Sequence, residues 1–156
     1  SPVSRSARTP KVLAVASKGG HWVQLKRLRP AFEGCDVLYV STHPDLARDV
    51  APARFAAVPD ANRWQKARVL WMFARVAWIV VRFRPNVVVT TGAAPGYAAL
   101  RFGKMLGART MWIDSVANAE ELSLSGTMAG RHADEWLTQW EHLAGPAGPR
   151  FEGSVL

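Results

Sequence analysis

The stretch that most constrains the fold of this chain is residues 11–21, Lys-Val-Leu-Ala-Val-Ala-Ser-Lys-Gly-Gly-His. Its apolar part, residues 12–16, has the length and composition of a buried strand. Helical spacing of apolar residues resumes at Trp22 and stops at Pro30. A strand, a glycine turn and a helix form the entry unit of a doubly wound α/β fold, so we predict a Rossmann-like parallel sheet. The turn lacks the G-x-G-x-x-G pattern of dinucleotide-binding domains.

The turn between this predicted strand and helix is made of Ser17, Lys18, Gly19, Gly20 and His21. Two adjacent glycines let the backbone approach a ligand closely, and the unpaired N–H groups at the start of a helix suit an anion. The same glycines would also serve a tight turn that binds nothing. Contact with a phosphate group and a purely structural turn are therefore both open.

A second strand–turn–helix unit follows later in the chain. A strand is expected at residues 86–91, a glycine turn at 91–96 and a helix at 97–106. The carboxyl ends of parallel strands meet at one edge of a sheet, where ligands bind in such folds. We therefore expect the second turn to lie beside the first, although a structural turn is again the alternative. The residues of this turn that we predict to line the site are Gly92, Ala93, Pro95 and Gly96.

The remaining strands are expected at residues 36–41, 55–58, 109–113 and 135–139, with the last of these as the final central strand. The strand at 109–113 delivers Asp114 and Ser115 to the same edge. A carboxylate at a strand's carboxyl end is a candidate for a site, and a capping aspartate is the alternative. Glu120 and Glu121 are further candidates for the cleft.

The composition is that of one domain with an anionic partner. The chain has 156 residues, 49% of them hydrophobic, and we predict a single domain at 11–156 after a disordered basic tail at 1–10. A formal charge of +8 favours a nucleic acid, a phosphate-bearing substrate or an anionic membrane surface. The basic residues are dispersed and no nucleic-acid motif is present, so we expect no nucleic acid. The single cysteine, Cys35, fits a reducing compartment, and the scattered histidines predict no metal site.

Residues 64–83 form the longest predicted helix. On a helical wheel, one broad apolar face is expected to meet the core: Val69, Leu70, Phe73, Ala77, Val80 and Val81. Beside it, tryptophans and arginines each recur every seven residues as a Trp–Arg face: Trp64, Arg68, Trp71, Arg75, Trp78 and Arg82. Three interpretations are open: tryptophans that cap the core beside solvated arginines, a surface that binds a membrane, and a docking face for a partner chain. The uncharged stretches are too short for a transmembrane helix.

Several short motifs occur in a characteristic order: Gly19-Gly20-His21, Arg63-Trp64-Gln65, Arg84-Pro85-Asn86-Val87-Val88, Thr91-Gly92-Ala93-Ala94-Pro95-Gly96, Ile113-Asp114-Ser115, Leu122-Ser123-Leu124-Ser125-Gly126 and Gln139-Trp140-Glu141. In this order they resemble the Alg14 family and its bacterial exopolysaccharide relatives of the PssD type. The Leu-Ser-Leu-Ser-Gly and Gln-Trp-Glu motifs are the most specific. The chain is more distantly similar to the amino-terminal half of the glycosyltransferase MurG.

The resemblance implies the amino-terminal, acceptor-side half of a GT-B glycosyltransferase made of two chains. An Alg13- or PssE-like catalytic subunit would carry most of the nucleotide-sugar site, with a UDP-sugar as donor and no further cofactor. The acceptor would be a sugar on a polyprenyl diphosphate, used in polysaccharide or lipid-linked glycan synthesis. The complex would act peripherally at the cytoplasmic face of the plasma membrane. The chain is also about half as long as a transferase whose cleft lies between two domains, which favours a second chain.

An inverting transfer needs a base on the acceptor hydroxyl, and the candidates are His21, Asp114 and Glu120 or Glu121. His21 and Asp114 leave strand ends directly, so we assign His21 to the acceptor diphosphate and Asp114 to the base. The predicted diphosphate site comprises Ser17, Lys18, Gly19, Gly20, His21, Gly92, Ala93, Pro95 and Gly96.

The sequence departs from the family pattern in two ways. Eukaryotic members carry an amino-terminal membrane anchor that this sequence does not show, so the Trp–Arg face replaces it or the anchor has been removed. Relatives more often have a glutamate at the position of Asp114.

Two rival functions are a non-catalytic scaffold that recruits a partner transferase to the membrane and a domain that binds nucleotides or nucleic acids.

Overall fold

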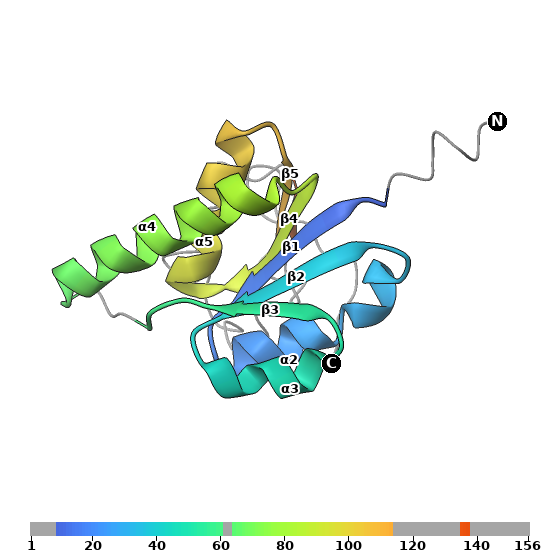
Figure 1. The fold of residues 1–156 in the computed structure, drawn as a ribbon, viewed down its shortest axis with the longest axis horizontal. Coiled ribbons are helices and arrows are strands. Elements are labelled where there is room, and N and C mark those ends of the chain that lie inside the picture. Colours follow the sequence, from blue (N-terminus) through green and yellow to red (C-terminus); the bar gives the residue numbers. More distant parts are fainter. Residues whose placement is uncertain (1–8, 61–63, 114–134, 138–156) are drawn as a thin grey trace.

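Six parallel strands form one sheet in the order β3-β2-β1-β4-β5-β6 in the computed structural model, which describes residues 9–60, 64–113 and 135–137 (Figure 1). The strands are β1 Lys11–Ala16, β2 Asp36–Ser41, β3 Arg54–Ala57, β4 Val87–Gly92, β5 Arg109–Ile113 and β6 Glu135–Leu137. The predicted doubly wound parallel sheet is confirmed. The strand predicted at residues 135–139 is confirmed over residues 135–137. Among the described strands it lies at the end of the order and pairs with β5 alone, so its expected central position is not observed.

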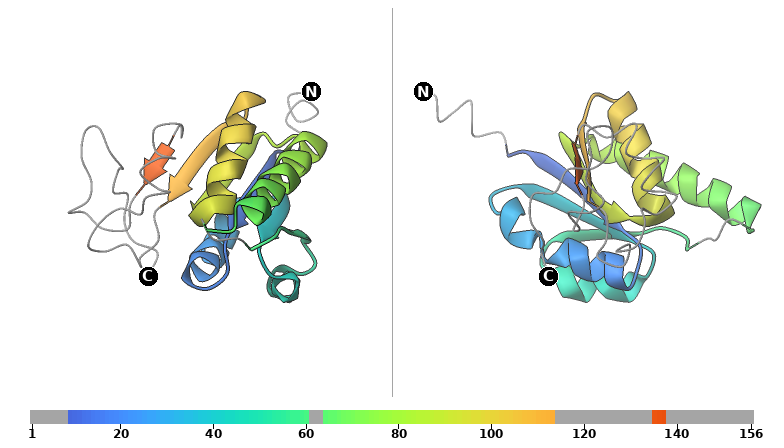
Figure 2. Two further views of the ribbon diagram at one scale, coloured as in Figure 1. Left: turned by 90° about the vertical axis from the view of Figure 1, so that its left-hand side faces the viewer. Right: turned by 180° about the vertical axis from the view of Figure 1, so that it is seen from behind.

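Helices cover both faces of the sheet (Figure 1, Figure 2). The first face carries the long helices α4, Lys66–Phe83, and α5, Ala93–Met105. The other face carries the shorter α2, Gly20–Lys26, and α3, Ala47–Val50. Two short 3₁₀ helices, η1 Arg29–Phe32 and η2 Pro44–Leu46, lie in the connections.

The alternation of side chains along β1 divides the core between these two faces. Leu13 and Val15 pack against α4 and α5, whereas Ala14 and Ala16 pack against α2 and α3. All four are fully buried, as expected for the central strand of a sheet that is covered on both sides. The central position of β1 follows from its uninterrupted apolar sequence.

On the α2 side, Trp22 fixes the helix to the sheet. Its ring meets Tyr39 and Phe55 edge-on, at centroid distances of 6.2 and 5.9 Å. Its indole Nε1 donates a hydrogen bond of 2.9 Å to a carboxylate oxygen of Asp49 in α3. The polar end of a buried tryptophan is thereby satisfied, and α2 and α3 are joined.

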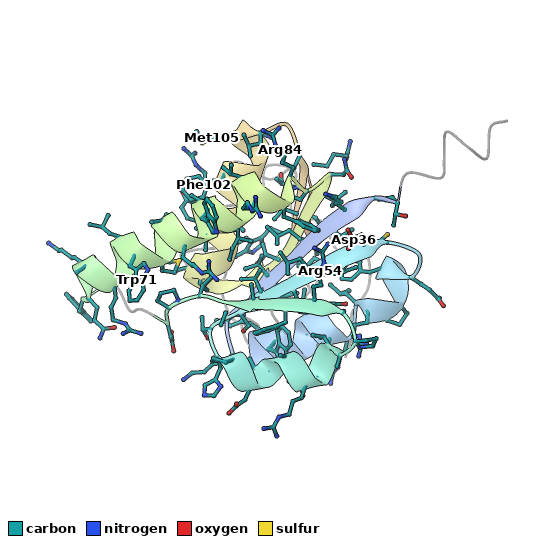
Figure 3. The ribbon with its side chains drawn as sticks, viewed as in Figure 1. Asp36, Arg54, Trp71, Arg84, Phe102 and Met105 are labelled. Atoms are coloured by element: carbon teal, nitrogen blue, oxygen red, sulfur yellow. The ribbon has the colours of Figure 1, made fainter. Side chains whose placement is uncertain are left out.

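The predicted core face of the long helix was wrong in part. The side chains of α4 that are buried against the sheet and α5 are Met72, Val76, Ile79, Val80 and Phe83. Phe73 adds an edge-to-face contact with Phe102, with the ring centroids 6.3 Å apart. Figure 3 labels Phe102 on α5. Leu70 and Val81, which were expected in the core, are 71% and 50% exposed. Apolar residues occur almost all around α4, so their periodicity does not identify the buried side.

The prediction of a second glycine turn at residues 91–96 was also wrong. Strand β4 ends at Gly92 and α5 begins at Ala93, so residues 93–96 are the first turn of this helix and not a loop. Pro95 is tolerated there because the N–H groups of a first helical turn have no partner within the helix.

Candidate functional site

The order of the strands places a topological switch point between β1 and β4. From β1 the chain adds β2 and then β3 on one side, and afterwards crosses to β4 on the other side of β1. The helices that follow β1 and β4 therefore lie on opposite faces of the sheet. The crevice at the carboxyl ends of two such strands is where open α/β sheets bind ligands.

His21 and Thr91 meet across this switch point. The Nδ1 atom of His21 lies 3.1 Å from the main-chain oxygen of Thr91. In return, the Thr91 hydroxyl donates a hydrogen bond of 2.6 Å to the main-chain oxygen of His21. Residues 70 positions apart in the sequence are thus joined twice. The expectation that the two glycine-containing segments lie side by side is confirmed by this contact.

Gly92 completes the contact because it leaves room for the imidazole. A Cβ atom at position 92 would lie 2.5 Å from His21 Nδ1 and 2.7 Å from Cε1, far inside van der Waals distance. Its φ of +142° is also one that side-chain-bearing residues rarely adopt. The requirement for glycine here comes from the close approach of His21, which sequence reasoning did not identify.

The first turn has the open approach that a ligand would need. Gly19 has a φ of +81°, and a Cβ at either Gly19 or Gly20 would meet no atom within 4 Å. Gly19 is therefore required by backbone conformation, whereas Gly20 has no steric reason within the described chain to be a glycine. Helix α2 has only seven residues, so side-chain charge matters more here than the helix dipole.

Lys18 of this turn forms an ion pair with Asp60, which was not predicted as a site residue. Its Nζ lies 3.4 Å from a carboxylate oxygen of Asp60, just after β3, and both side chains are more than half exposed. The main-chain oxygen of Asp60 in turn accepts a hydrogen bond of 2.9 Å from Arg68 Nε. Asp60 therefore connects the glycine turn to the first turn of α4.

Gly96 has a packing explanation. A Cβ at this position would overlap the Oγ1 of Thr90, and it would lie 2.9 Å from the Thr90 Cβ. The Thr90 hydroxyl also accepts a hydrogen bond of 3.1 Å from Gly92 N. Gly96 thus lets α5 lie close to β4, and its contact with an anion stays a prediction.

The outer face of α4 carries Leu70, Trp71, Ala74, Trp78 and Val81, all of them exposed. Trp71 and Trp78 are 63% and 57% exposed, so the interpretation that they cap the core is wrong. Arg68, Arg75 and Arg82 follow one edge of this face, and Arg82 lies 5.8 Å above the ring of Trp78. A wide apolar strip bordered by arginines is exposed on the same helix whose other side forms the core.

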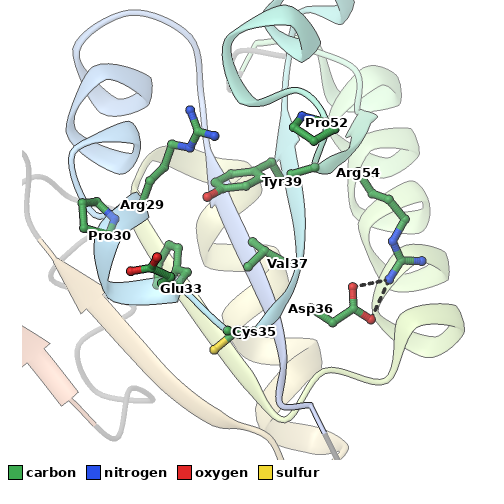
Figure 4. A pocket seen from close by; sticks show the side chains of 12 residues that line it. Arg29, Pro30, Glu33, Cys35, Asp36, Val37, Tyr39, Pro52 and Arg54 are labelled. Atoms are coloured by element: carbon green, nitrogen blue, oxygen red, sulfur yellow. Dashed lines mark hydrogen bonds and ion pairs between the residues drawn. The ribbon is translucent and has the colours of Figure 1, made fainter.

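A separate cavity of about 1060 Å³ lies at the amino edge of β2 and β3, away from every predicted site residue (Figure 4). Arg54 reaches both carboxylate oxygens of Asp36 on one side of it, at 2.8 and 2.9 Å. On the other side, burial raises the pKa of Tyr39 above its ordinary value, and the nearby Arg29 opposes this shift. The ion pair joins the start of β2 to the start of β3, and the Tyr39 ring belongs to the core. Both features are accounted for by the fold, so this cavity is not the candidate site.

The other predicted site residues are Asp114, Ser115, Glu120 and Glu121, and they lie outside the described residues, as do residues 1–8 of the predicted tail. Within the described ranges, no three His, Cys, Asp or Glu side chains are grouped so as to hold a metal ion. No helix in that part of the chain is long and apolar enough to cross a bilayer.

The fold is that of the Rossmann-like amino-terminal domain of GT-B glycosyltransferases. MurG from Acinetobacter baumannii superimposes with a TM-score of 0.75, at 12% identity, over 91% of this chain and 45% of that chain. UDP-N-acetylglucosamine 2-epimerase from Rickettsia bellii gives a TM-score of 0.64, at 14% identity, over 86% and 40% of the two chains. At these identities the likeness concerns the fold alone.

The chain belongs to the Alg14 family. The family described as "Oligosaccharide biosynthesis protein Alg14 like" matches residues 47–151. The UDP-N-acetylglucosamine transferase subunit ALG14 of Eremothecium gossypii is 33% identical over 104 residues, 63% of this chain and 46% of that protein. The subunit of the same name from Yarrowia lipolytica is 36% identical over 78 residues, 46% of this chain and 36% of that protein. The matched part of this chain thus spans less than half the length of either relative.

Proposed function

We propose that this chain is the acceptor-binding, membrane-associating subunit of a two-chain glycosyltransferase. It would hold a polyprenyl-diphosphate-linked sugar while an Alg13/PssE-like catalytic subunit binds the nucleotide sugar. The names of the two ALG14 relatives favour UDP-N-acetylglucosamine as the donor. No other cofactor enters this proposal.

The observation that carries the proposal is the junction between the outer face of α4 and the glycine turn. Arg68 on α4 contacts Asp60, and Asp60 contacts Lys18, so the helix begins beside the carboxyl edge of the sheet. A lipid whose tail lies near α4 would bring its diphosphate to this edge. Lys18 would exchange its exposed partner Asp60 for a phosphate oxygen at little cost, because exposed ion pairs contribute only about 0–1 kcal/mol.

The outer face of α4 supports a peripheral association with the cytoplasmic side of the membrane. Tryptophan rings favour the interfacial region of a bilayer, and arginines on the adjacent edge would meet lipid phosphates. Each arginine near an anionic membrane surface contributes about 1 kcal/mol to binding. We therefore expect Arg75→Gln with Arg82→Gln to weaken binding to phosphatidylglycerol vesicles about 10- to 30-fold, with little effect on neutral phosphatidylcholine vesicles.

In the transfer step, the acceptor hydroxyl would lose its proton to a base while its oxygen attacks the anomeric carbon and UDP departs. We keep Asp114 as the proposed base on sequence grounds. His21 is proposed to contact the acceptor diphosphate, because it is the ionisable side chain held at the switch point among the described residues. Either ring protonation state leaves one ring nitrogen that Thr91 does not use.

The test is reconstitution with purified components. The full chain, the partner subunit, radiolabelled UDP-N-acetylglucosamine and a short polyprenyl-diphosphate acceptor are mixed, and labelled lipid is counted. We expect transfer only with both proteins present. Robust transfer by this chain alone would contradict the two-chain model.

A His21→Gln variant separates the site from the scaffold alternative. Loss of transfer with an intact complex supports an acceptor site at the switch point. Unchanged transfer supports a chain that only recruits and stabilises its partner. The exposed His43, after β2, provides the matched control, and His43→Gln should leave transfer unchanged.

A further inference from the structure

We propose that Thr91 is a positioning residue that fixes the tautomer of His21, so that any proton His21 exchanges with a ligand is carried on Nε2. The proposal about catalysis rests on the proposed function, in which His21 contacts the acceptor. The proposal about the tautomer concerns this chain alone and is testable without any substrate.

The tautomer follows from the chemistry of the two atoms in contact. A main-chain carbonyl oxygen carries no proton, so the 3.1 Å contact with Thr91 is a hydrogen bond only when His21 Nδ1 is protonated and donates. In the neutral ring Nε2 then carries the lone pair. In the charged ring Nε2 carries the proton that can be lost while the contact with Thr91 is kept.

A bulge in β4 presents Thr91 to His21. Val15 of β1 pairs with Thr90, but the next residue, Ala16, pairs with Gly92, so Thr91 is an extra residue in the ladder. Such a bulge turns the backbone locally and redirects the groups of the extra residue, and bulges are frequent beside active sites. At this irregular position the main-chain oxygen of Thr91 lies 3.1 Å from His21 Nδ1.

The two hydrogen bonds between His21 and Thr91 have different roles. The bond from Thr91 Oγ1 to the His21 main-chain oxygen, at 2.6 Å, holds the backbone at the start of α2. The bond from Nδ1 holds the rotation of the ring. The missing side chain of Gly92 leaves room for the ring, since a Cβ there would be 2.5 Å from Nδ1. Together they fix both the position and the orientation of the imidazole.

The consequence is that Nε2 is the ring atom available to a ligand. None of the described residues forms a hydrogen bond with it, whereas Nδ1 is committed to Thr91. A base, or a donor to phosphate, works best when one defined atom carries the proton and is held in place. Thr91 determines which ring nitrogen is protonated and holds the ring in place without contacting the substrate.

The test measures the tautomer directly in the full-length, ¹⁵N-labelled chain. Long-range ¹H–¹⁵N spectra at neutral to alkaline pH distinguish a protonated Nδ1 from a protonated Nε2, and the His21→Gln variant assigns the His21 signals among the four histidines. We expect the Nδ1–H tautomer in the unmodified chain, in Thr91→Ser and in Thr91→Val, because all three keep the accepting main-chain oxygen. A mixture of tautomers is expected in Gly92→Ala, whose Cβ would displace the ring from this oxygen. An Nε2–H tautomer in the unmodified chain, or an unchanged tautomer in Gly92→Ala, would overturn the proposal.

Transfer by the reconstituted complex gives the second measurement. Thr91→Val removes the hydrogen bond that holds the start of α2, so it should raise the KM for the acceptor about tenfold with a smaller change in kcat, and Thr91→Ser should restore it. If His21→Gln leaves transfer unchanged while the tautomer result holds, the proposed role of His21 fails and the structural inference stands. If Thr91→Val leaves the KM for the acceptor unchanged, the positioning role of Thr91 is overturned.

Discussion

His21 and Thr91 are joined by two hydrogen bonds, of 3.1 and 2.6 Å, between segments 70 residues apart in the chain. This pair lies at the point where the strand order reverses, with α2 on one face of the sheet and α5 on the other. Residues that follow β1 and β4 are therefore in contact, and substitutions in either segment should affect both.

Replacing Gly92 by alanine should displace the His21 ring. The new Cβ would lie 2.5 Å from Nδ1, and the φ of +142° would disfavour any side chain. We expect a loss of about 1–3 kcal/mol in unfolding free energy, measured by urea denaturation, together with loss of transfer in the complex. Gly34→Ala is the matched control, because Gly34 also has a positive φ, +84°, but a Cβ there meets nothing within 4 Å. Equal effects of the two changes would contradict the proposed contact with His21.

Replacing Gly20 by alanine separates a ligand-binding turn from a structural one. Its Cβ would meet no atom within 4 Å, and alanine favours the helical conformation that Gly20 already has. We expect the chain to become more stable by about 0.5–1 kcal/mol. If the acceptor diphosphate approaches this backbone, the KM for the acceptor should rise about tenfold or more. A stabilised variant with unchanged KM would show that the turn has no ligand role.

Replacing Trp71 and Trp78 together by serine should release the chain from membranes. Both side chains are more than half exposed, so we expect the unfolding free energy to change by less than about 0.5 kcal/mol. Sedimentation with phosphatidylcholine–phosphatidylglycerol vesicles should show at least a tenfold weaker affinity, which corresponds to about 1.4 kcal/mol. Val23→Ser, at an exposed apolar residue of α2, is the control. Full vesicle binding by the double variant would exclude this face and favour docking of a partner chain.

The stability of the chain in acid should depend on Asp49. The hydrogen bond from Trp22, and then that from Lys26, hold the pKa of Asp49 below its ordinary value of 3.8. The resulting stabilisation is present above the unfolded-state pKa and is lost as the pH falls through the lowered pKa of the folded state. Asp49→Asn should therefore be less stable than the unmodified chain at neutral pH, and the difference should shrink below about pH 4.

Urea midpoints between pH 3 and pH 7 test this expectation. Asp45→Asn controls for the loss of a surface carboxylate, because Asp45 is exposed and its described ion pair is with His43. A constant difference between Asp49→Asn and the unmodified chain across this range would contradict a role for the Trp22–Asp49 hydrogen bond.

The sequence determined the architecture because strand and helix signals are local. The run of apolar residues in β1, the glycine turn after it and the proline after α4 are all readable from neighbouring residues, and β5 has the predicted bounds. The same local signals predicted Gly19 and His21 as candidate site residues. They also identified the Trp–Arg face, although they did not show which side of α4 is buried.

The remaining features depend on tertiary structure because each of them involves residues that are far apart along the chain. Which side of α4 meets the sheet depends on the position of α5, since apolar residues surround the helix. The need for glycine at position 92 comes from the ring of His21, and the bulge at Thr91 comes from its pairing with β1. Asp60 joins the glycine turn to α4 only when β3 is in place. No periodicity in the sequence encodes contacts between residues that folding alone brings together.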